Sequence, residues 1–146
     1  MFTHILVCAD GSEPSLKAAQ TAADLAQKCS AQVTLLHVLD PRANALPVEG
    51  AWEASLGAGA MAYYRHEAEL SVEQPTRKFF TEADVECQWK FKVGYPVETV
   101  LESAADLNAD LIVLGSRGLG GFKRLMLGSV SDGVLHHAHC PVLIVR

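Results

Sequence analysis

The chain has 146 residues, of which 49% are hydrophobic and 20% are charged, and its formal net charge is −5. This length suits one domain, which we expect to span residues 1–146, and the acidic balance argues against nucleic acid as a partner. No apolar run approaches the roughly 18 residues that a membrane-spanning helix needs. The first residues show no basic region ahead of an apolar stretch, so we expect no signal peptide and a cytoplasmic location.

The first half of the chain alternates between strand and helix patterns. A β-branched, apolar run over 3–9 predicts a buried strand, and apolar residues at helical spacing predict a helix over 15–28. A second buried strand is predicted over 32–39. The segment 41–58, which contains Pro and Gly among small residues, predicts an irregular connection. A helix is then predicted over 59–83, with a weak point at its proline.

The second half continues the alternation. Strict alternation of apolar and polar residues over 85–93 predicts a half-exposed strand, which is typical of a sheet edge. An amphipathic helix is predicted over 97–107, and a buried strand over 111–114. A long loop then leads to a short helix over 128–137 and a last strand over 142–145.

Strands that alternate with helices favour a parallel sheet covered on both sides. We therefore predict an α/β fold with a single doubly wound, Rossmann-like, open parallel sheet of five strands and helices on both faces. Ligands of such sheets bind beyond the carboxyl ends of the strands, where the winding reverses. This rule selects two loops, residues 9–12 after the first strand and the loop that begins at Gly115 after the fourth.

The loop after the fourth strand is rich in glycine and carries positive charge. Glycines allow backbone N–H groups to approach an anion closely, and a helix that begins at Gly128 and Ser129 offers free N–H groups to a phosphate. The cationic residues of this loop are Arg117, Lys123 and Arg124. A second interpretation remains open, in which the glycines only serve turns and Ser129 only caps the helix.

The spacing of Gly115, Gly118, Gly128 and Ser129 is G-x2-G-x9-G-S. It resembles the G-x2-G-x9-G-[S/T] signature of the nucleotide-binding branch of the universal stress protein family. The segments 5–19, 109–118 and 128–146 resemble three blocks of that family in the same order, whereas 41–84 is not specific to any family.

This resemblance implies an adenine nucleotide as ligand: ATP, or AMP or ADP, with Mg²⁺. It implies that Asp10 lies near the ribose and that Ala9 and Val38 flank the adenine. It also implies a set of residues around the ribose and phosphates: Gly115, Arg117, Gly118, Gly128, Ser129, Val130 and Ser131. Without the resemblance, an aspartate at position 10 would more often be a turn or helix-capping residue.

Three functions compete. The first is a nucleotide-dependent stress-response or signalling module that acts on an unidentified protein partner. The second is a slow ATPase or autophosphorylating protein, in which Ser129 or Ser131 accepts a phosphoryl group. The third is a nucleotide-independent dimeric scaffold. We see no catalytic constellation in the sequence, so we expect a binding protein with at most slow turnover. The strand over 142–145 is apolar and holds no proline or charged residue that would discourage pairing with another chain. This favours a homodimer through that strand.

The histidines and cysteines predict no further site. A cluster near the end of the chain contains His136, His137, His139 and Cys140. Its three histidines do not share one helical face, so we expect no metal there. Imidazoles at a helix end instead face its carbonyl groups. His37 lies inside a strand, where we expect a structural role. The four cysteines are far apart and form no CxxC pair, which predicts reduced thiols.

Overall fold

The computed structural model describes residues 1–44, 52–118 and 126–146, with side chains from residue 57 onward in the second of these segments. The strands are β1 (His4–Cys8), β2 (Gln32–Leu39), β3 (Cys87–Val93), β4 (Leu111–Gly115) and β5 (Val142–Val145). The helices are α1 (Glu13–Cys29), α2 (Trp52–Ala68), α3 (Gln74–Glu82), α4 (Pro96–Asp106) and α5 (Ser129–His137), with a π-helical segment, η1 (Glu69–Glu73), between α2 and α3.

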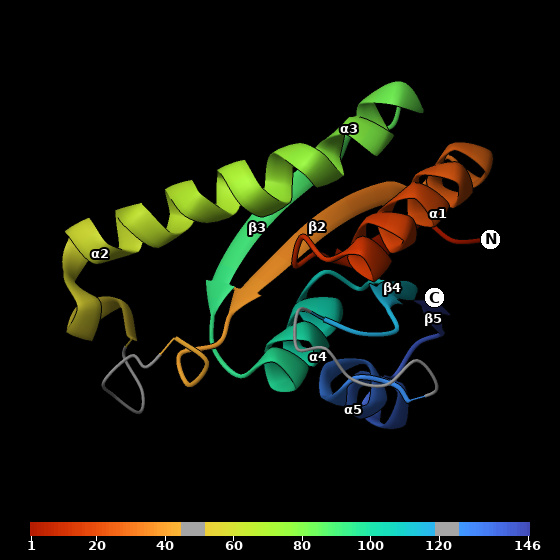
Figure 1. Cartoon of the computed structure of the whole chain (residues 1–146). Helices are drawn as coiled ribbons and strands as arrows, with labels where there is room; N and C mark the ends of the chain where they lie inside the picture. Colours follow the sequence, from red (N-terminus) through yellow and green to blue (C-terminus); the bar gives the residue numbers. More distant parts are fainter. Residues whose placement is uncertain (45–51, 119–125) are drawn as a thin grey trace.

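The five strands form one parallel sheet in the order β3-β2-β1-β4-β5. The chain winds outward from β1 through β2 to β3, then crosses to β4 on the other side of β1 and continues to β5. Helices α1, α2 and α3 lie on one face of the sheet, and α4 and α5 lie on the other (Figure 1). The predicted doubly wound α/β fold is confirmed, and its winding reverses between β1 and β4.

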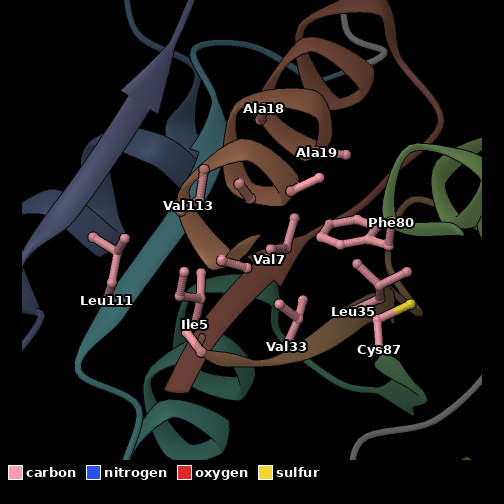
Figure 2. Close-up of a cluster of buried hydrophobic side chains, with 14 residues drawn as sticks. Ile5, Val7, Ala18, Ala19, Val33, Leu35, Phe80, Cys87, Leu111 and Val113 are labelled. Atoms are coloured by element: carbon pink, nitrogen blue, oxygen red, sulfur yellow. The ribbon is translucent and has the colours of Figure 1, made fainter. Parts of the chain in front are cut away.

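Alternate residues of the strands point into two separate cores. On the α1 side, Ile5 and Val7 pack against the small alanines of α1 and against Phe80 of α3, which is fully buried (Figure 2). On the opposite side, Leu6 packs with residues of α4 and α5, including Val134. Burying an aromatic side chain of this size contributes about 1.5–3 kcal/mol to the free energy of folding. Each helical layer is therefore stabilised by the apolar face that it packs against the sheet.

The strands and most helices fall where the sequence predicts them, and β3 is an edge strand as expected. The region between β2 and β3 differs. Helix α2 begins inside the segment predicted to be irregular and is interrupted at Gly57, whose φ is 74°. The helix predicted over 59–83 is divided by η1. Pro75 lies in the first turn of α3, where the missing backbone N–H of proline costs no hydrogen bond within that helix. Pro47 and Gly50 lie outside the described residues.

All four cysteines are free thiols. Within the described part of the chain, no helix is long and apolar enough to cross a membrane.

Candidate functional site

A cavity of about 600 Å³ opens beyond the carboxyl ends of the central strands, at the point where the winding reverses. It lies between the turn after β1 and the loop after β4, where the sequence predicts that a ligand binds. Ten of its lining residues are the ones singled out in the sequence: Ala9, Asp10, Val38, Gly115, Arg117, Gly118, Gly128, Ser129, Val130 and Ser131. The fold therefore brings together residues that are more than 100 positions apart.

The carboxylate of Asp10 organises the turn between β1 and α1. Its Oδ1 accepts hydrogen bonds from the Ser12 amide at 2.9 Å and from the Ser12 hydroxyl at 2.5 Å. The Ser12 oxygen in turn accepts from the amide of Ser15 at 3.3 Å and so caps α1. The other oxygen of Asp10, Oδ2, faces the loop after β4, because a Cβ placed on Gly118 would lie 2.9 Å from it. Asp10 is thus a turn residue that also presents one carboxylate oxygen beside the cavity.

Gly11 follows Asp10 in the left-handed region, with φ of +80°. A side chain at this position would be strained, and its Cβ would lie 2.9 Å from the carbonyl oxygen of Ser71 in η1. The turn after β1 is therefore pressed against the π-helical segment. Ser71 and Val72 of that segment line the same cavity.

The loop after β4 is closed at its base by hydrogen bonds to Ser116. Its carbonyl oxygen accepts from the Gly128 amide at 2.8 Å and lies 3.0 Å from the hydroxyl of Ser131. The Ser116 amide donates to the carbonyl of Val145 in β5 at 2.7 Å. Gly115 has a packing role, because a Cβ there would lie 2.7 Å from the backbone of Pro14. The two ends of the loop are therefore fixed to the sheet and to α1.

Helix α5 begins with an uncapped N-terminus that faces the cavity. Its N-cap residue is Gly128, and no side chain caps it, so the interpretation in which Ser129 caps the helix is wrong. The first intrahelical hydrogen bond runs from the Asp132 amide to the Gly128 carbonyl. Among the described residues, nothing accepts from the amides of Ser129, Val130 and Ser131. Free amides and the helix dipole together attract an anion.

Positive charge near this helix end comes from Arg117, which lines the cavity. Lys123 and Arg124, the other two cationic residues predicted for the loop, lie outside the described residues. The anion-binding character at this end of the cavity thus rests on the α5 amides and on Arg117.

A further wall of the cavity, which was not predicted from the sequence, carries two tyrosines and apolar side chains beside the polar Glu67 and Ser71. Residues of α2 and η1 form this wall: Tyr63, Tyr64, Glu67, Ala68, Ser71 and Val72. These residues lie in 41–84, where no motif or turn signal marks a site. The packing of α2 over β3 and of η1 against the turn at Gly11, which is a tertiary property, brings them to the cavity (Figure 1).

Two further unpredicted residues, Cys8 and His37, lie beside Ala9. Burial and the negative charge of Asp10 raise the pKa of the Cys8 thiol to about 12, so it is a protonated, unreactive filler. The ring of His37 is half-buried, and its Nδ1 lies 2.7 Å from the carbonyl oxygen of Ala9. Burial lowers the pKa of His37, although the Ala9 carbonyl and the Asp10 charge oppose the shift.

The histidines at the end of α5 face backbone carbonyls, as expected. The Nδ1 atom of His136 lies 2.8 Å from the carbonyl of Asp132, and that of His137 lies 2.9 Å from the carbonyl of Gly133. In the ranges that the structure describes, no three His, Cys, Asp or Glu side chains are grouped so that they could hold a metal ion.

These features define a class: a doubly wound α/β protein with a glycine loop and an open helix N-terminus at the switch point of its sheet. Comparison with known proteins identifies the family. The model of the universal stress protein family matches residues 1–146, and the chain belongs to this family.

The relatives agree with this assignment. The universal stress protein MJ0531 of Methanocaldococcus jannaschii is 33% identical over 147 residues, covering 100% of this chain and 83% of its own. The solved structure of hypothetical protein MJ0577 superposes with a TM-score of 0.83 at 26% identity and covers 99% of this chain and 96% of its own. A universal stress protein in complex with cAMP has a TM-score of 0.67 at 25% identity and covers 99% of this chain and 97% of its own.

Proposed function

We propose that this chain binds an adenine nucleotide, ATP with Mg²⁺, in the cavity beyond β1 and β4, and acts as a nucleotide-dependent stress-response module that signals to a protein partner. The observation that carries the proposal is the polarity of the cavity. One end offers open α5 amides and Arg117, whereas the wall from α2 and η1 supplies aromatic and apolar surface through Tyr63, Tyr64, Ala68 and Val72, beside the polar Glu67 and Ser71. A nucleotide has the same division between its phosphates and its base. The cAMP complex of a family member supports this ligand class.

The geometry favours one orientation of the nucleotide. Its phosphates lie at the amides of Ser129 to Ser131, and its base lies toward Ala9 and Val38. The Oδ2 atom of Asp10, which is not used by the turn, accepts from the ribose hydroxyls. In this orientation the oxygen donor available to Mg²⁺ beside the phosphates is the Ser129 hydroxyl. A cavity of about 600 Å³ is within the usual range of small-molecule sites.

Slow turnover remains an alternative, and the structure distinguishes between its two candidate acceptors. The buried hydroxyl of Ser131 lies 3.0 Å from each of two carbonyl oxygens, those of Ser116 and Gly128. The side chain of Ser129 is exposed at the start of α5. If the protein autophosphorylates at this loop, Ser129 is therefore the acceptor.

We also propose a homodimer through β5, which is an edge strand of the sheet. The carbonyls of Pro141 and Val145 accept from the amides of Ile112 and Ser116 on the β4 side. Because backbone groups alternate along a strand, the amide and carbonyl of Ile144 point away from β4 and are available to a second copy. A two-fold axis makes such a pair antiparallel.

The test of the nucleotide site compares two glycine-to-valine variants. A side chain on Gly118 meets the Asp10 carboxylate, whereas nothing lies within 4 Å of a Cβ on Gly59 in α2. We expect the parent to bind ATP in calorimetry and Gly118→Val to bind it at least about tenfold more weakly, which corresponds to about 1.4 kcal/mol. Gly59→Val should bind like the parent.

Circular dichroism should show that both variants are folded, and analysis of any nucleotide that co-purifies with the parent would identify the resident ligand. A parent that binds no adenine nucleotide would refute the proposed function. Equal affinities of Gly118→Val and Gly59→Val would show that the ligand does not occupy this end of the cavity.

A further inference from the structure

The imidazole of His37 is held in one orientation at the base end of the cavity. Residue 37 pairs with Phe91 in the register of β2 and β3, and its ring lies 5.9 Å from the Phe91 ring. It also stacks on Trp89, with ring centroids 6.2 Å apart and an interplanar angle of 6°. These contacts, together with the hydrogen bond to Ala9, fix the position of both ring nitrogens.

The hydrogen bond determines which nitrogen carries the proton. A backbone carbonyl only accepts hydrogen bonds, so the Nδ1 atom of His37, 2.7 Å from the Ala9 oxygen, is the donor. Burial lowers the pKa of the ring, which keeps it neutral at physiological pH. A neutral imidazole with a proton on Nδ1 has a lone pair on Nε2.

Among the residues that the structure describes, this lone pair has no hydrogen-bond donor. Across residues 1–44, 52–118 and 126–146, the Ala9 carbonyl is the one group that hydrogen-bonds to the His37 ring. His37 nevertheless lines the cavity, so a ligand can reach it. Nε2 is not among the buried atoms without a partner in the described residues, so it is open to solvent, and a donor on a ligand can take the place of water there.

The position of the ring decides which part of a nucleotide supplies the donor. His37 is bonded to Ala9 and adjacent to Val38, the two residues that we propose to flank the base. The ribose hydroxyls have their own acceptor in the Asp10 oxygen, which lies on the Gly118 side. The donor near His37 therefore belongs to the base. In adenine it is the exocyclic amino group, whereas a purine with a 6-oxo group would place an acceptor there.

We propose that Nε2 of His37 accepts a hydrogen bond from the exocyclic amino group of the bound base, and so selects an amino-purine over a purine without that group. This inference rests on the proposed nucleotide function. It adds a specificity-determining residue on β2 to the residues that the sequence singles out.

The test is a cycle of two nucleotides and three proteins, measured by calorimetry. The nucleotides are ATP and purine riboside triphosphate, which lacks the amino group. The variant His37→Asn keeps a side-chain N–H near the position of Nδ1, and thus the bond to Ala9, but has no acceptor at Nε2. The variant His37→Gln places an amide oxygen near Nε2 and serves as the rescue.

We expect the parent to bind ATP about three- to tenfold more tightly than the analogue, which is the effect of one neutral hydrogen bond. His37→Asn should bind both nucleotides equally, and His37→Gln should recover part of the preference. A general loss of structure would weaken both nucleotides alike and leave the ratio unchanged. A parent without preference, or a His37→Asn protein that keeps it, would overturn the inference while ATP binding itself stands.

A measurement on the parent does not depend on how the variants fold. In protein with ¹⁵N-labelled imidazoles, the Nε2 resonance of His37 should move when ATP is added, and move less with purine riboside triphosphate. Identical shifts with both nucleotides would overturn the inference. If neither nucleotide binds, the proposed function fails, and the inference fails with it.

Discussion

Replacing Asp10 separates its role in the turn from its proposed role in ligand binding. In Asp10→Ala, the amide and the hydroxyl of Ser12 lose an acceptor that lies at 2.9 Å and 2.5 Å. Ser12 is only 7% exposed, so its amide cannot be fully satisfied by water. A hydrogen bond to a charged group is worth about 1.5–3 kcal/mol, and the hydroxyl can rotate to another acceptor. We therefore expect Asp10→Ala to lower the free energy of unfolding by about 2–3 kcal/mol.

The variant Asp10→Asn keeps an oxygen at the Oδ1 position and should lose only about 1 kcal/mol, because its hydrogen bonds are neutral. The control is Asp24→Ala, which removes an exposed carboxylate from the middle of α1. Urea unfolding followed by circular dichroism gives the three values. If Asp10→Ala unfolds within about 0.5 kcal/mol of Asp24→Ala, the hydrogen bonds to Ser12 do not stabilise the turn as described.

The same variants test the ribose contact. Asp10→Ala should weaken ATP binding by about 1–3 kcal/mol, the range of a hydrogen bond to a charged group. Its effect on 2′-deoxy-ATP should be smaller, because one hydroxyl partner is already missing. Equal losses for the two nucleotides would show that Asp10 acts only through the turn.

Two further predictions concern the sheet. Ile144→Pro removes an amide that points away from β4, so the protomer should stay folded while the dimer dissociates to a monomer in sedimentation velocity. The control Ile144→Val should remain a dimer. A monomeric parent would contradict the proposed assembly. Asp110 is partly buried, which would raise the pKa of its carboxyl, but hydrogen bonds from Thr3 and His4 more than offset this and lower it. Asp110→Asn should therefore cost about 1–2 kcal/mol at neutral pH, and the difference should vanish as pH falls through that lowered pKa; a difference that persists in acid would refute the assignment.

The strands were predictable because their patterns reflect burial directly. Apolar residues on both faces mark β1, β2 and β4 as central, and strict alternation marks β3 as an edge. A buried strand leaves a continuous apolar run in the sequence whatever its neighbours are. The alternation with helices then predicts a parallel sheet with few possible topologies, whereas the order β3-β2-β1-β4-β5 comes from the structure.

The wall formed by α2 and η1 could not be predicted in the same way. Its helix carries little amphipathic pattern, and its path is broken at Gly57 and again through η1. The residues that reach the cavity, such as Tyr64 and Ser71, do so because η1 is pressed against the turn at Gly11. That contact joins segments about 60 residues apart and leaves no local signal. A π-helical segment is often found beside functional sites, and here its residues Ser71 and Val72 line the cavity.

The start of α5 shows why the site departs from ordinary helix chemistry. Serine or asparagine at an N-cap gives its side-chain oxygen to the first amides of the helix, whereas glycine gives none. At position 128 glycine leaves the amides of Ser129 to Ser131 open, and this choice weakens the helix by only a few tenths of a kcal/mol relative to serine. A serine hydroxyl at this position would occupy an amide that a phosphate needs, and its Cβ would lie 3.3 Å from the Cα of Arg117. The small loss of helix stability at Gly128 is therefore what keeps these amides open for the proposed phosphate contact at this end of the cavity.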